Sequence, residues 1–223
     1  MNLDRRDFFT TITLGVGASA FPNFMNEFNE LQPVKLNSNI DMNDLSNWFN
    51  KIKGDHRVAY DGSTPHNTLP IVWNWAFLES NNSVGEKDSN LTAMTVLRHS
   101  GIVFAFNSDI WNKFKLGELV SFNDNKTKKP ALRNTVYDPQ DGDMPMPQIQ
   151  GIKDLQSRGS LFCVCDLATK VYGSAVAKKL NLNPDEVYSE MVKGILPEIK
   201  LVPSGVWALG RAQNKKCAYI FAG

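Results

Sequence analysis

The last third of the chain alternates short apolar runs with helical segments, and this alternation limits the possible folds more than any other feature. Residues 160–165 form an apolar run typical of a buried strand, and a helical pattern follows at Asp166. Two more apolar runs, at 199–203 and 217–221, enclose a helix that Ser204 caps. Strands separated by helices in this way predict βαβ units and a parallel sheet.

Two further strands are expected upstream. The segment 69–78 is almost continuously apolar, as expected for a strand covered on both faces, and 101–106 reads the same way. Helical patterns are predicted at 44–52 and at 89–99, while 56–67 reads as irregular. The chain is therefore predicted to be an α/β protein with a Rossmann-like, open, mostly parallel five-stranded sheet and helices on both faces.

A long insert interrupts this pattern at about 118–151. It contains a basic cluster and several prolines, and it shows little periodicity; the residues are Lys126, Lys128, Lys129, Arg133, Pro130, Pro139, Pro145 and Pro147. Loops of this length inside compact domains are usually lids, interaction arms or disordered inserts. We expect one α/β domain over 41–223 that carries this Pro-rich insert.

The first 20 residues have the pattern of an export signal. Arg5-Arg6 is followed by Phe8-Phe9, then by a weakly apolar stretch that ends in Ala18-Ser19-Ala20, a small-residue cleavage site. This pattern predicts a twin-arginine signal peptide over 1–20 and a linker over 21–40. The expected partner during export is the twin-arginine translocase, and the expected location is the periplasm, with no membrane span in the mature protein.

The composition of the chain and the motifs that it lacks exclude several function classes. The formal net charge is +1, and no nucleic-acid-binding motif is present, so nucleic acid is not an expected partner. The chain has no Gly-rich dinucleotide fingerprint, P-loop, zinc-protease motif or nucleophile elbow. We therefore expect no cofactor.

The carboxyl ends of the predicted strands indicate where a ligand would bind. In an open parallel sheet these ends share one edge, where the helix N-termini also lie. The expected strand ends lead into four polar segments, which are Glu79-Ser80-Asn81, Asn107-Ser108-Asp109, Cys165-Asp166 and Ser204-Gly205. The predicted binding residues are Asn107, Asp109, Asp166, Ser204 and Gly205, arranged around Cys165.

The chain has three cysteines, so at least one thiol is unpaired within the chain. Cys165 lies at a strand end, where the dipole of the next helix would favour a thiolate, although Asp166 opposes this effect. Cys163 and Cys217 are expected to be core thiols, and packing remains the alternative reading for Cys165. The Cys163–Cys165 pair lacks the further ligands that zinc needs. A Cu(I) site on the two thiols stays open, but we predict no metal site.

Several segments resemble the DsrE/DsrF-like family, in particular a subgroup with twin-arginine signals. The similar segments are 161–168, 201–209, 218–220, 97–107 and 111–118, within a resemblance that covers about 69–223. The resemblance implies a Rossmann-like sheet and a homo-oligomer, since trimers and hexamers are common among relatives. Some relatives carry sulfane sulfur as a cysteine persulfide, and by position Cys165 would be that cysteine.

Two functions are consistent with these observations. In the first, the exported protein is a thiol-dependent sulfur carrier whose Cys165 takes sulfur from a small sulfur compound and passes it to an acceptor thiol. In the second, the protein is a non-catalytic, oligomeric module that binds a small ligand or a partner at the sheet edge. An accessible Cys165 would favour the first function, and a buried one would argue against it.

Overall fold

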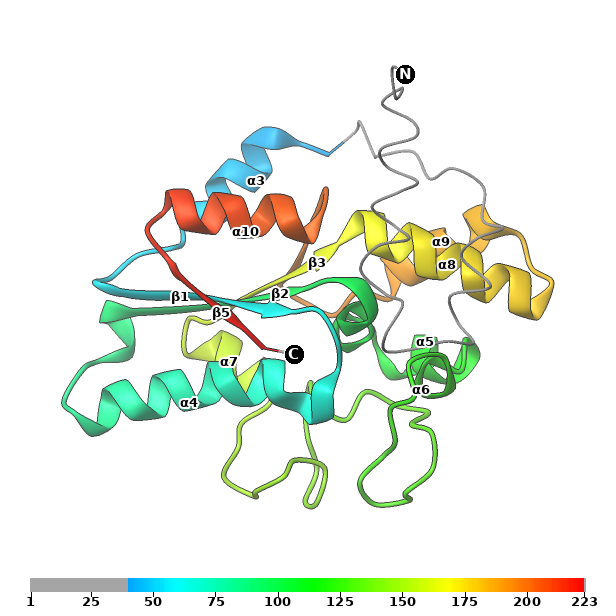
Figure 1. The fold of residues 1–223 in the computed structure, drawn as a ribbon, viewed down its shortest axis with the longest axis horizontal. Helices are drawn as coiled ribbons and strands as arrows, with labels where there is room; N and C mark the ends of the chain where they lie inside the picture. The colour runs from blue at the N-terminus through cyan, green and yellow to red at the C-terminus, as the bar shows by residue number, and fades with distance from the viewer. Residues whose placement is uncertain (1–39, 223) are drawn as a thin grey trace, which may run out of the picture.

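The structure, a computed structural model, describes residues 40–222. One parallel sheet lies at its centre, with the strand order β4-β3-β2-β1-β5 (Figure 1). The strands are β1 (His56–Gly62), β2 (Leu91–Leu97), β3 (Leu161–Cys165), β4 (Ile199–Val202) and β5 (Ala218–Phe221). The predicted α/β class and the five-stranded parallel sheet are confirmed.

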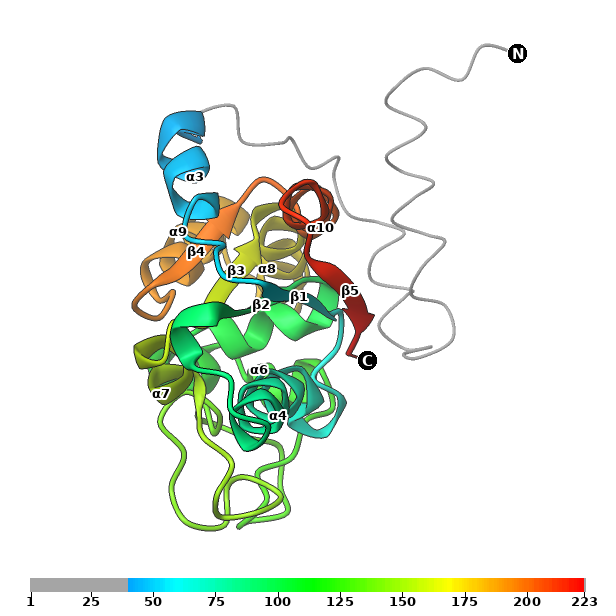
Figure 2. The same ribbon diagram turned by 90° about the vertical axis from the view of Figure 1, so that its left-hand side faces the viewer.

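Helices cover both faces of the sheet, so the molecule has three layers (Figure 2). One face carries α3 (Met42–Phe49) and α10 (Gly205–Asn214). The other face carries α4 (Leu69–Ser83), α7 (Ile152–Ser157) and α8 (Asp166–Leu180), and α9 (Pro184–Lys193) packs on α8. The shorter helices are η1 (His66–Thr68), η2 (Asp88–Asn90), η3 (His99–Ala105), α5 (Ser108–Lys113) and α6 (Leu116–Leu119).

The two central strands explain why the core divides into two halves. Every residue of β2 and of β3 is buried, because helices cover both faces of the sheet. Alternate side chains point to opposite faces, so Val96 contributes to the cluster beneath α3 and α10, whereas Leu97 contributes to the cluster on the other side.

The strands predicted at 160–165, 199–203 and 217–221 are confirmed, as are the helices that begin at Asp166 and after Ser204, because their boundary signals are local. The Asn183 side chain accepts hydrogen bonds from the Asp185 and Glu186 amides at the start of α9. In the same way, Ser204 accepts a hydrogen bond from the Trp207 amide at the start of α10. Such caps fix where a helix begins.

The strand predicted at 69–78 is wrong, since this segment forms most of the helix α4. An unbroken apolar run does not distinguish a buried strand from a buried helix. The helix is 15 residues long and has Pro70 in its first turn, where proline is tolerated. Glu79-Ser80-Asn81 therefore lies in the last part of a helix, away from the carboxyl ends of the strands.

Three other predictions upstream are also wrong. The stretch read as irregular contains β1, whose polar ends enclose a buried centre from Val58 to Tyr60. The helix predicted at 89–99 is mainly β2, whose β-branched residues favour a strand. The strand predicted at 101–106 is the 3₁₀ helix η3 for most of its length.

The predicted signal peptide over 1–20, and all but the last residue of the predicted linker over 21–40, lie outside the described residues. Among residues 40–222, no helix combines the length and the apolar character needed to cross a bilayer.

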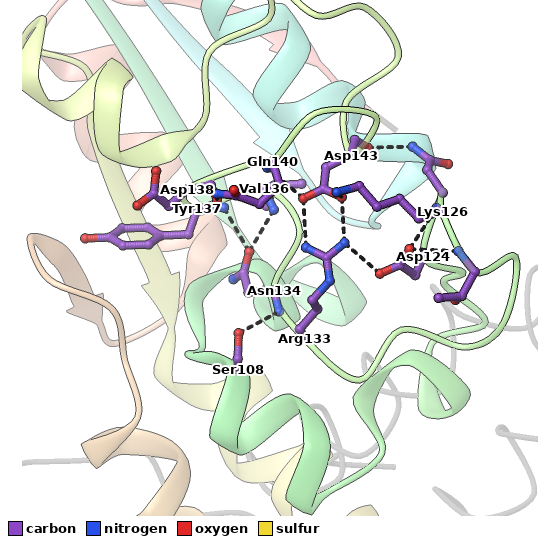
Figure 3. A network of polar contacts seen from close by, with 12 residues as sticks. Ser108, Asp124, Lys126, Arg133, Asn134, Val136, Tyr137, Asp138, Gln140 and Asp143 are labelled. Atoms are coloured by element: carbon purple, nitrogen blue, oxygen red, sulfur yellow. Dashed lines mark hydrogen bonds and ion pairs between the residues drawn. The ribbon is translucent and has the colours of Figure 1, made fainter.

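The Pro-rich insert is held together by Arg133. Its guanidinium makes a two-pronged contact with Asp143, at 2.6 and 2.7 Å, and a further ion pair of 2.8 Å with Asp124 (Figure 3). Lys126 lies 3.8 Å from the Asp143 carboxylate. Arg133 is thus the centre of an ion-pair network within the insert, and the predicted basic cluster is partly neutralised.

Asn134 joins the insert to the rest of the domain. Its side-chain amide donates to the carbonyls of Phe104 and Phe106, at 2.9 and 2.8 Å. Its side-chain oxygen accepts from the amides of Val136 and Tyr137 (Figure 3). One buried side chain therefore connects the insert to the end of η3.

Candidate functional site

The chain changes sheet faces between two neighbouring strands, β3 and β4. After β3 the chain enters α8, which packs on the same face as α4, whereas after β4 it enters α10 on the opposite face. In open α/β sheets, ligands bind in the crevice at such a switch point, outside the carboxyl ends of the strands. Cys165 ends β3, and Ser204 follows β4 closely, so the predicted site contains this switch point.

Cys165 lies near the first turns of both α8 and α10. It is the N-cap residue of α8, and its Sγ accepts a hydrogen bond from the Ala168 amide at 3.2 Å. The backbone of Gly205, at the start of α10, also hydrogen-bonds to this sulfur. The residue is only 5% exposed. The sulfur is therefore enclosed and contacts the first turns of both helices.

Burial raises the pKa of the Cys165 thiol above its usual value. The hydrogen bonds from the Ala168 and Gly205 amides and the charge of Arg98 act in the opposite direction, while Asp166 adds to the increase in pKa. Desolvation is the largest of these effects, so the thiol is neutral at pH 7 in this conformation. The amides at the two helix N-termini therefore lower the pKa of the thiol, as expected, but burial outweighs them.

The other two cysteines are core residues, as predicted. Cys163 and Cys217 are buried in the cluster beneath α3 and α10, and burial raises the pKa of both thiols. All three cysteines are free. Cys165 contacts the cluster on the opposite face, because the chain leaves the strand there.

An arginine that the sequence analysis missed lies beside Cys165. Arg98 follows β2 and donates two hydrogen bonds to the buried Asp61, from Nε at 2.6 Å and from Nη2 at 2.9 Å. The Tyr219 hydroxyl donates to the same carboxylate at 2.8 Å. Arg98 was expected inside a helix, so nothing in the sequence pattern placed it at the sheet edge.

Gly205 allows α10 to approach this arginine. A Cβ atom at Gly205 would lie 2.5 Å from Cβ and 3.0 Å from Cδ of Arg98. No side chain fits in that space without a shift of the arginine. The glycine therefore brings the N-terminus of α10 against both Arg98 and the Cys165 sulfur.

Asp166 is engaged by neighbouring side chains. Its carboxylate is fully buried, accepts a 2.6 Å hydrogen bond from the Tyr188 hydroxyl, and lies 3.0 Å from the Lys170 ammonium. These contacts link α8 to α9. Asp166 lies next to Cys165, as predicted, but its negative charge is neutralised.

His99, the residue after Arg98, contacts the segment that follows β1. The Tyr172 hydroxyl lies 3.2 Å from its Nδ1, and its ring also hydrogen-bonds to the backbone of Ser63. Burial lowers the pKa of His99, and the charge of Arg98 lowers it further. His99 is therefore a neutral polar group in the folded protein.

Two predicted site residues do not follow a strand of the sheet. Asn107 is the N-cap of α5, where its side chain accepts from the Ile110 amide, and its own amide donates to Gly194. Asp109 is exposed on α5. The structure thus brings together Cys165, Asp166, Ser204 and Gly205, and it leaves Asn107 and Asp109 on a separate helix.

Within residues 40–222, no group of three or more histidine, cysteine, aspartate or glutamate side chains is arranged to hold a metal ion.

No protein-family model matches the chain, and no curated protein matches it. A solved structure of a protein of unknown function from Methanobacterium thermoautotrophicum aligns with 75% of this chain and 99% of its own, at 15% identity and a TM-score of 0.36.

Proposed function

We propose that the protein is a non-catalytic module that binds a small anionic ligand at the switch point between β3 and β4. The observation that carries this proposal is the convergence of the N-termini of α8 and α10 on Cys165, beside Arg98. Helix N-termini favour anions, because unpaired amides and the helix dipole both lie there.

The charges around the site support an anion as the ligand. Asp61 is paired with Arg98, and Asp166 with Lys170, so both nearby carboxylates are neutralised. The lowered pKa of His99 leaves that ring uncharged. What remains is the positive end of each helix dipole, equivalent to roughly +0.5 of a charge each, and the Nη1 group of Arg98, which does not bond to Asp61.

Titration calorimetry with thiosulfate and sulfate tests this proposal, with acetamide as a neutral probe. We expect the anions to bind and the neutral probe not to bind. The paired variant Asp61→Asn/Arg98→Gln, which keeps the local charge balanced, should weaken binding by about tenfold or more. Lys179→Gln, on the exposed far end of α8, is the control. Equal binding by the paired variant would exclude Arg98 from the site.

A second candidate function is sulfur carriage by Cys165, as the resemblance to DsrE-like proteins implies. Two backbone amides and Arg98 surround the sulfur, an arrangement that stabilises negative charge on it. In this reaction the Cys165 thiolate attacks the outer sulfur of a polysulfide, whose S–S bond breaks and releases a polysulfide shorter by one sulfur. An acceptor thiolate then attacks the outer sulfur of the persulfide and releases the Cys165 thiolate. The buried sulfur requires the site to open first.

Intact mass after incubation with polysulfide distinguishes the two functions. Sulfur carriage predicts a gain of one sulfur atom that reductant reverses, that Cys165→Ser abolishes and that Cys217→Ser retains. Anion binding without sulfur transfer predicts no adduct, and unchanged affinity in Cys165→Ser. An adduct that survives in Cys165→Ser would place the reactive thiol elsewhere.

We also propose that the protein works in the periplasm after export through the twin-arginine translocase. The supporting observation is the pattern of residues 1–20 described above. Cell fractionation tests it: Arg5→Lys/Arg6→Lys should keep the protein in the cytoplasm, while the wild type should be periplasmic. A homo-oligomer, trimer or hexamer, is the corresponding proposal for assembly, and light scattering of the purified protein tests it.

A further inference from the structure

The connection from β1 to α4 contains a buried hydroxyl that has no hydrogen-bond partner in the described part of the chain. This hydroxyl belongs to Thr68, which is 2% exposed. Thr68 is the N-cap residue of α4, a helix of 15 residues. Its hydroxyl therefore lies at the amino end of a long helix, on the same edge of the sheet as the carboxyl end of β1.

An N-cap threonine normally accepts a hydrogen bond from an amide in the first turn. Thr68 makes no such bond. Pro70 occupies the second helical position and has no N–H, and the Leu69 amide already donates to the His66 carbonyl. The Thr68 hydroxyl and the amides in the first turn of α4 therefore do not hydrogen-bond to each other.

The backbone that positions this hydroxyl has an unfavourable conformation. His66, Asn67 and Thr68 have φ values of 34°, 51° and 71°, so three successive residues other than glycine are left-handed. For a β-branched residue such as threonine this conformation is uncommon. A buried, unsatisfied hydroxyl also destabilises a fold, and it calls for a partner that residues 40–222 do not supply.

We propose that the N-terminus of α4 and the Thr68 hydroxyl bind a tetrahedral oxyanion, either free phosphate or a phosphate group on a larger ligand. The hydroxyl would donate to one oxygen of the anion, which the helix dipole attracts. The first turn of α4 carries no acidic side chain, so nothing within the helix opposes a negative charge there. This site is separate from the switch point between β3 and β4.

The test is an amide-resolved NMR titration of the full chain with sodium phosphate, compared with sodium chloride at equal ionic strength. We expect saturable shifts of the Leu69 and Ile71 amides with phosphate only. Thr68→Val removes the hydroxyl but keeps the shape, and it should raise the dissociation constant by about tenfold or more. Thr68→Ser should retain binding.

Several outcomes would overturn this proposal. If the Leu69 and Ile71 amides do not respond to phosphate, the hydroxyl is satisfied by an ordered water only. Equal affinity in Thr68→Val would show that the hydroxyl takes no part. Thermal melts test the proposal even if the valine variant differs in stability. Phosphate should raise the melting temperature of the wild type more than that of Thr68→Val. An equal rise in both proteins would overturn the proposal.

Two further comparisons distinguish the possible sources of the oxyanion and distinguish the two proposed sites. Tighter binding of methyl phosphate than of inorganic phosphate would indicate a phosphate carried by an organic ligand, and tighter binding of inorganic phosphate would indicate the free ion. The Ala168 and Gly205 amides report on the switch point in the same spectra. A response there without one at α4 would overturn this inference alone.

Discussion

Gly205 lies so close to Arg98 that a Cβ atom on the glycine would be 2.5 Å from the Cβ of the arginine. This contact joins the N-terminus of α10 to the loop that follows β2. It also sets the distance between that helix and the Cys165 sulfur, so it is the point at which the architecture of the site can be tested most directly.

Gly205→Ala should therefore destabilise the fold by about 1–3 kcal/mol, because the arginine must move to admit a methyl group. Gly210→Ala, in the same helix, is the matched control, since no atom of residues 40–222 lies within 4 Å of a Cβ atom there. It should stabilise the fold by about 0.5–1 kcal/mol through its higher helix propensity. Urea unfolding measures both changes, and equal effects would contradict the contact.

Asp61→Asn should destabilise the protein by about 3 kcal/mol or more, because it leaves the largely buried Arg98 charge without its partner. The carboxylate is 2% exposed and accepts from both Arg98 and Tyr219. Asp138→Asn breaks the exposed ion pair with Lys153 and should leave the free energy of unfolding unchanged. A similar, small effect of both substitutions would mean that Asp61 does not hold Arg98.

Stability should fall as the pH decreases below about 6.5, and His99 should contribute to that fall. Its pKa is lowered in the folded protein, mainly by burial. The unfolded chain therefore gains a proton at a higher pH than the folded chain does, so acid favours unfolding until the folded pKa is also passed. His99→Asn, chosen because asparagine tolerates the left-handed backbone at this position, should flatten the pH dependence of the unfolding free energy. An unchanged dependence would exclude His99 as a cause.

Arg133→Gln should loosen the insert while the sheet stays intact. The substitution removes the paired contact with Asp143 and the ion pair with Asp124. Hydrogen exchange of amides from 122 to 143 should become faster by about tenfold or more, whereas exchange in β2 and β3 should not change. Lys129→Gln, an exposed lysine in the same loop, is the control. Faster exchange in the sheet as well would show that the insert supports the whole domain.

The fold class was predictable from the sequence, but the location of two strands was not. Caps such as Ser204 and Asn183 mark helix starts locally, which is why the second half of the domain could be predicted. The run at 69–78 was placed wrongly because an unbroken apolar run does not distinguish a buried strand from the buried helix that it forms. β1 was missed because only its centre is apolar, with Arg57 and Asp61 near its ends.

The candidate site was predictable only where the strand predictions were correct. Cys165 and Gly205 follow strands whose positions were predicted, and they converge in the structure. Arg98 was not predicted as a site residue, because β2 had been predicted as a helix. Its ion pair with Asp61 also joins two neighbouring strands, β1 and β2. No local pattern reports a contact between residues 37 positions apart.

The strand order has a consequence for how the chain is made. β1 pairs with β2 on one side and with β5, the last strand, on the other. During synthesis the outer side of β1 therefore stays unpaired until residues 218–221 have left the ribosome. Contacts between such distant segments form slowly, so chaperones have a long interval in which to bind the incomplete sheet.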